Sequence, residues 1–66
     1  MRITINGDLR EVPEPSTIES LVHFLELPAA TLLIELNEVA LRKSEWSRSD
    51  LKPGDRVEFI RIAAGG

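Results

Sequence analysis

Every second residue is hydrophobic at the beginning of the chain. Residues 1–6 alternate in this way, which predicts a strand with one buried face. Asn6-Gly7 follows, and this pair favours a type I′ turn because both residues tolerate a positive φ. We therefore expect a hairpin in which residues 8–12 return as a second strand and Pro13 ends it.

Hydrophobic residues next repeat with the spacing of an amphipathic helix. They stand at Ile18, Leu21, Val22 and Leu25. Ser16 and Glu19 fit a capping box at the beginning of this helix. Pro28 is expected to stop it near residue 26 or 27. A helix of roughly 11 residues cannot bury its apolar stripe alone, so we expect it to lie across a sheet.

Three more strands are predicted in the rest of the chain, at residues 31–36, 39–41 and 56–62. The segment 42–50 is polar apart from Trp46, and we expect one helical turn there at most. Lys52-Pro53-Gly54-Asp55 predicts a type II turn before the last strand, because Pro sets φ at the second position and Gly supplies a positive φ at the third.

The order of these elements predicts a fold. The first and last strands can pair in parallel through a long crossover. The result is an α+β fold of the ubiquitin-like β-grasp type, a mixed sheet of four to five strands with one main helix packed across it. Residues 1–62 would form this domain, and residues 63–66 a flexible C-terminal Gly-Gly tail.

Composition excludes several classes of function. The chain has 66 residues, a net charge of −3, no Cys and one His. No disulfide, thiolate metal site or cysteine nucleophile is possible. No run of basic residues appears, so nucleic-acid binding has little support. No stretch is long and apolar enough for a membrane or a signal peptide, so we expect a cytoplasmic protein. His23 falls between apolar positions of the helix, so we expect it to be exposed and to have no catalytic role. With this residue set aside, no pattern in the sequence indicates an enzyme.

The C-terminal residues offer a different chemistry. Ala63-Ala64-Gly65-Gly66 carries almost no side chain and can reach about 13 Å from the domain, into a channel too narrow for bulkier residues. The terminal carboxylate of Gly66 is ionised at neutral pH. It is a poor electrophile, so it needs activation by adenylation before a sulfur donor can convert it to a thiocarboxylate.

Several short motifs in this order resemble one family. They are Asn6-Gly7 after the opening strand, the helix over 17–25, Leu36-Asn37 followed by Trp46, Gly54-Asp55, and Ala64-Gly65-Gly66. The sequence is similar to the ThiS family of thiamine-biosynthesis sulfur carriers over nearly its whole length. The family often carries a Val-Pro-Arg-like segment before the tryptophan, where this chain has Leu41-Arg42-Lys43. The resemblance therefore does not extend to the shape of this loop.

The resemblance implies a reaction cycle and its partners. A ubiquitin-activating-type enzyme would adenylate Gly66 with ATP and Mg²⁺. Sulfur from a cysteine desulfurase would give the thiocarboxylate, and thiazole synthase would take the sulfur for the thiazole of thiamine. Gly65, preceded by Ala64, would match the residue that threads the partner's active site. The carrier itself would hold no cofactor and no metal.

A docking surface is expected beside the tail. In the last strand Val57 and Phe59 can face the core, which leaves Ile60 and Ile62 on the opposite face. Exposed apolar clusters usually mark interfaces, so these two residues are candidate partner contacts. The alternative is that neighbouring strands half cover them. Trp46 is expected to cover the edge of the core rather than to contact a partner.

Three other functions fit the same pattern. A molybdopterin-synthase small subunit shares the fold and the Gly-Gly end, although that family is usually longer. A ubiquitin-like protein modifier would join Gly66 to a lysine. A β-grasp interaction module would have an inert tail, and one residue added after Gly66 would then leave its function intact.

Overall fold

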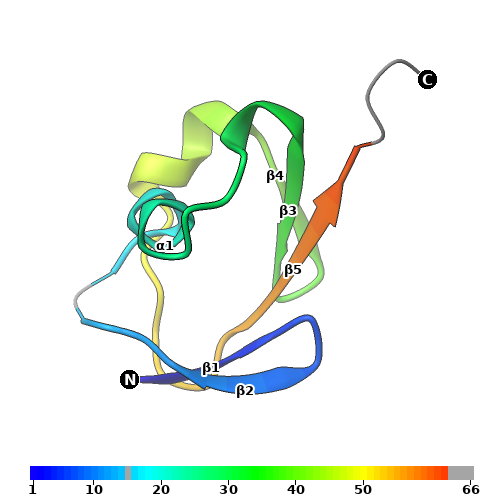
Figure 1. The fold of residues 1–66 in the computed structure, drawn as a ribbon. Coiled ribbons are helices and arrows are strands. Elements are labelled where there is room, and N and C mark those ends of the chain that lie inside the picture. Colours follow the sequence, from blue (N-terminus) through cyan, green and yellow to red (C-terminus); the bar gives the residue numbers. More distant parts are fainter. Residues whose placement is uncertain (15, 63–66) are drawn as a thin grey trace.

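The computed structural model describes residues 1–14 and 16–62. Five strands form one mixed sheet, and the main helix crosses one of its faces (Figure 1), which confirms the predicted α+β arrangement. The elements are β1 (Arg2–Ile5), β2 (Asp8–Glu11), α1 (Ile18–Phe24), the 3₁₀ helix η1 (Ala29–Thr31), β3 (Leu32–Leu36), β4 (Val39–Leu41), the 3₁₀ helix η2 (Lys43–Arg48) and β5 (Arg56–Arg61).

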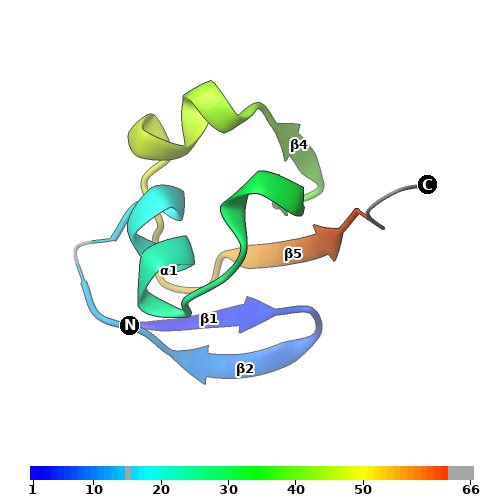
Figure 2. The ribbon, with the colours of Figure 1, turned by 45° about the horizontal axis from the view of Figure 1, so that its top comes forward.

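The last strand lies at the centre of the sheet. The strand order is β2-β1-β5-β3-β4, and β5 runs parallel to β1 and antiparallel to β3. Figure 2 shows β1 and β5 side by side, with β2 outside them. The predicted parallel pairing of the first and last strands is therefore confirmed. The strand that precedes the C-terminal residues is therefore paired on both sides.

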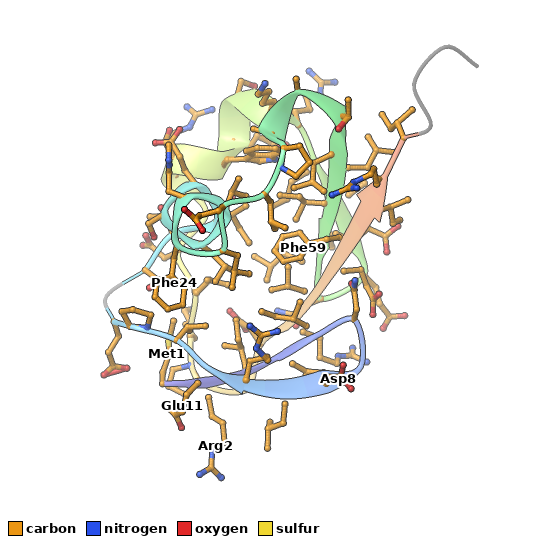
Figure 3. All side chains as sticks on the ribbon, in the orientation of Figure 1. Met1, Arg2, Asp8, Glu11, Phe24 and Phe59 are labelled. Carbon is orange, nitrogen blue, oxygen red and sulfur yellow. The ribbon has the colours of Figure 1, made fainter. Side chains whose placement is uncertain are left out.

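The core lies between the sheet and α1. Ile3 and Ile5 point into it, as their alternation predicts, and Val57 of β5 is fully buried. Phe59 is half-buried, and Figure 3 shows its ring between β5 and α1. The eleven buried hydrophobic residues are Ile3, Ile5, Val12, Ile18, Leu21, Val22, Leu32, Ile34, Trp46, Leu51 and Val57.

Asn6 fastens the first hairpin to the central strand. It adopts φ 49° and Gly7 φ 86°, as the predicted turn requires. The Asn6 side chain accepts a hydrogen bond from the Phe59 backbone N–H at 2.7 Å and donates one to the Phe59 carbonyl at 3.4 Å. This side chain extends the contact between the two strands beyond the end of β1, because the paired residues of β1 stop at Ile5.

An ion pair closes the other end of this hairpin. Arg2 Nε lies 3.2 Å from a carboxylate oxygen of Glu11, and Figure 3 shows both residues at the same end of β1 and β2. The hydrogen bond from Arg2, together with the N-terminal ammonium, lowers the pKa of Glu11. A lowered pKa means that this contribution to stability is present above the ordinary pKa of Glu and is lost as the pH falls through the lowered value.

The predicted capping box of α1 is wrong by one residue. The N-cap is Thr17, whose hydroxyl accepts from the Ser20 N–H, while the Ser20 hydroxyl accepts from the Thr17 N–H. Ser16 instead donates its hydroxyl to the Pro13 carbonyl, and its own carbonyl accepts from the Leu51 N–H. Two capping patterns overlap in the sequence, and the pairing of Ser16 with a distant segment selects the second.

The helix is also shorter than predicted, with seven residues rather than roughly 11. It ends at Phe24 because Glu26 adopts φ 55°, in the left-handed region. The Glu26 N–H then bonds to the His23 carbonyl and the Leu27 N–H to the Val22 carbonyl, which is the pattern of a Schellman motif. The helix thus ends in this turn, before it reaches Pro28.

Glu26→Gly should stabilise the protein. Glycine adopts the left-handed conformation without the steric cost that a Cβ brings, so the free energy of unfolding should rise by about 0.5–1 kcal/mol. Urea unfolding measures the difference. The control is Glu19→Gly in the first turn of α1, where the same replacement should lower the free energy of unfolding by about 1 kcal/mol. Equal effects of the two replacements on the free energy of unfolding would contradict the left-handed conformation of Glu26.

Segment 42–50 holds more helix than predicted. Lys43–Arg48 forms two turns of 3₁₀ helix, η2, where one turn at most was expected. The Glu45 carboxylate caps it by accepting from the Arg42 N–H at 2.6 Å. Trp46 anchors η2 against α1 and is 4% exposed, so its predicted role as a cover on the core is confirmed.

Candidate functional site

The predicted site residues at the C-terminus lie outside the residues that the structure describes. Ala64, Gly65 and Gly66 lie beyond residue 62, so their roles stay predictions. Ile62 still follows the sheet, because its N–H donates to the Thr31 carbonyl at 2.8 Å. The described part of the candidate site is therefore the end of β5 and the surfaces on either side of it.

An apolar patch covers the outer face of the sheet at this end. Ile60 and Ile62, the predicted docking residues, are 46% and 48% exposed. Leu33 lies directly opposite Ile60 in the antiparallel register of β3 and β5 and is 50% exposed. We call Leu33, Ile60 and Ile62 the outer patch. The alternation of β3 could have revealed Leu33, since its neighbours Leu32 and Ile34 face the core.

Two carboxylates continue this face next to the outer patch. Glu35 and Glu58 are directly opposite each other in the same register. Like charges in this position repel one another and destabilise a sheet. Within residues 1–14 and 16–62 neither carboxylate has a cation within ion-pair distance. An apolar patch beside two unneutralised carboxylates suits a partner surface with an apolar centre and a basic neighbour.

The remaining candidates do not form a reaction centre. His23 is exposed on α1, as predicted, and lines a hollow of about 480 Å³ together with Trp46. Across the described part of the chain, no three His, Cys, Asp or Glu side chains are grouped so that they could hold a metal ion. None of the helices within the described residues is long and apolar enough to cross a membrane.

The chain matches the model of the ThiS family over residues 3–66. Its fold is also that of a solved relative. The crystal structure of the thiamine biosynthesis protein ThiS from Geobacter metallireducens superposes with a TM-score of 0.89. The two sequences are 30% identical, and the match covers 100% of both chains. The predicted β-grasp fold is confirmed by this likeness.

Curated sequences give two further relatives. An uncharacterized protein, ycf40, from Porphyra purpurea is 30% identical over 64 residues, which are 97% of this chain and 90% of that protein. A protein named thiazole synthase from Paramagnetospirillum magneticum is 27% identical over 66 residues. That match covers the whole of this chain but only 20% of the longer protein.

Proposed function

The chain belongs to the ThiS family, and on this premise we propose that it is a cytoplasmic sulfur carrier protein of thiamine biosynthesis rather than an enzyme. The observation that carries the proposal is the end-to-end likeness to a thiamine biosynthesis protein, together with a family match that extends to Gly66. The exposed apolar side chains Ile60 and Ile62 support the proposal, because they offer a surface to a partner at the end of β5.

The reactive group in this proposal is the carboxylate of Gly66. One of its oxygens attacks the α-phosphorus of ATP, with Mg²⁺, in the active site of a ubiquitin-activating-type enzyme, and pyrophosphate leaves. The outer sulfur of a persulfide, supplied through a cysteine desulfurase, then attacks the acyl carbon, and AMP leaves. A thiol attacks the inner sulfur of the resulting acyl disulfide, which releases the thiocarboxylate and leaves the thiol and the donor cysteine joined as a disulfide. Gly65 and Ala64 would lie in the partner's channel, where any larger side chain would obstruct the passage.

The outer patch is the proposed docking surface for this activating enzyme. Ile62 is four residues from Gly66, so a partner that covers the outer patch is within about 13 Å of the reacting carboxylate. Covering the three apolar side chains would remove them from water and would contribute free energy of association. A cation on the partner would relieve the repulsion between Glu35 and Glu58.

Thiazole synthase is the proposed acceptor of the sulfur. A protein of that name contains a segment similar to this whole chain. Joining a carrier and an acceptor in one polypeptide raises their effective concentration, which is useful when the two act in successive steps. We therefore propose that this chain donates sulfur to a thiazole synthase through the same thiocarboxylate.

The intact mass of the protein tests the proposal. The chain is incubated with ATP, Mg²⁺, a ThiS-activating enzyme, a cysteine desulfurase and cysteine. The expected result is a mass gain equal to the exchange of one oxygen for one sulfur, absent when ATP is omitted. Fragmentation should place the gain on Gly66. Lysine-linked adducts in place of a thiocarboxylate would overturn the assignment.

A further inference from the structure

A groove lies on the face of the sheet opposite the outer patch. It has a volume of about 380 Å³ and lies between the end of α1 and the strands β1, β2, β3 and β5. Its floor is apolar and includes Phe59, Leu32 and Leu25. Two arginines, Arg10 and Arg61, line the same groove. We call it the Arg10–Arg61 groove.

The register of the sheet explains why both arginines point to this side. Arg10 of β2 is opposite Ile3, which is fully buried, and Arg61 of β5 is opposite Leu32, which is 8% exposed. Paired residues share a face of the sheet, so both cations lie on the face that α1 covers. Such positions are normally apolar, and two arginines there call for an explanation.

Both guanidinium groups lack partners within the part of the chain that the structure describes. The arginines with ion pairs there are Arg2 and Arg56, and neither Arg10 nor Arg61 donates a side-chain hydrogen bond. Each retains planar N–H donors that match a carboxylate in a bidentate geometry. The groove is thus a locally basic site in a protein whose net charge is −3.

The early end of α1 keeps this groove open. The helix stops at Phe24, and the left-handed turn at Glu26 leads the chain away towards η1. A helix of the predicted length would have continued across the sheet. The observed one leaves Phe59 half-buried, and its ring remains available to a ligand.

We propose that the Arg10–Arg61 groove binds an acidic segment of the activating enzyme, in which a carboxylate stands beside an apolar side chain. The inference rests on the proposed function and adds a second contact to it. The carboxylate pairs with Arg10 and Arg61, and the apolar side chain packs on Phe59 and Leu32. Charge complementarity favours this occupant, because an acidic carrier attracts an acidic segment only where its own surface is locally basic.

The location gives this contact a purpose. Arg61 is the last residue of β5, and Ile60 on the other side of the same strand belongs to the outer patch. A partner that occupies the outer patch and the groove therefore holds the end of β5 on both faces. Holding the strand in this way keeps the end of β5 beside the active site, so the groove adds to the affinity for the activating enzyme rather than to the rate of the bound complex.

Charge reversal at both arginines tests the proposal. The variant Arg10→Glu, Arg61→Glu is compared with the wild type in ATP-dependent pyrophosphate release by the activating enzyme. We expect kcat/KM for the carrier to fall at least about tenfold, because two favourable charge pairs become repulsive. The kcat at saturating carrier should stay within about twofold of the wild type. Added salt should lower kcat/KM of the wild type more than that of the variant.

The control reverses two other exposed cations, Arg48→Glu with Lys52→Glu, which gives the same net charge near the beginning of α1. Both variants should unfold at the temperature of the wild type, since all four side chains are exposed. If the wild type is active and the groove variant matches the control at every salt concentration, the groove proposal is wrong while the proposed function stands. If the wild type releases no pyrophosphate, both proposals fail.

Discussion

Deleting Gly66, or adding one glycine after it, should abolish sulfur loading in the assay with ATP, activating enzyme and sulfur donor. Both variants still end in a carboxylate on a glycine, so the chemistry of the end group is unchanged. Its position shifts by one residue, or about 3.3 Å. Misplacement by about 1 Å can cost about 100-fold in rate, so we expect a loss of at least that size in both variants.

The same variants should unfold like the wild type. The buried core of the described domain begins at Ile3 and ends at Val57, and none of its residues is changed in these variants. Thermal unfolding of all three proteins checks this. A truncated chain that still gains sulfur would contradict a site at Gly66, and one that unfolds at a lower temperature would show a structural role for the residue.

The strands were predictable because local pattern and tertiary structure agree there. Alternation over residues 1–6 placed Ile3 and Ile5 in the core, and Asn6-Gly7 formed the turn that it favours. The parallel pairing of β1 with β5 followed from the order of the elements. Each of these features depends on neighbours in sequence or on a general rule of connection, so one sequence suffices to predict it.

The ends of α1 depend on contacts that the sequence does not display. Thr17 becomes the N-cap because the Ser16 carbonyl pairs with Leu51, more than thirty positions away. Glu26 turns left-handed although glutamate has no preference for that conformation. Burial of the Leu27 region against the core over-rides the local preference, and the helix loses a turn that its hydrophobic spacing allowed.

The sequence predicted only those residues of the candidate site that lie on one strand. Ile60 and Ile62 emerged from the alternation of one segment, and their exposure is as expected. Leu33 joins them through the pairing of β3 with β5. Arg10 and Arg61 share a groove although 51 positions separate them. Residues that meet only across the sheet need the register, and the sequence gives no register between distant strands.

Ile62→Asp and Leu33→Asp should each lower kcat/KM for activation about 100-fold. A docked partner would cover the outer patch, and an aspartate there would lose water without gaining a cation. A penalty of about 2.7 kcal/mol corresponds to this factor. Leu33 is the sharper test, because it belongs to β3 and a change there cannot act through the residues that follow β5. Steady-state pyrophosphate release measures both variants.

The matched control for these variants is Leu9→Asp. Leu9 is 65% exposed and pairs with Thr4, on the same outer face of the sheet but on the edge strand β2, away from the outer patch. Leu9→Asp introduces the same charge at an exposed apolar position outside the outer patch, so its activation kinetics should match the wild type. All three variants should keep the wild-type unfolding temperature to within a few degrees. If Leu33→Asp and Leu9→Asp have the same activation kinetics, the outer patch is not part of the docking surface.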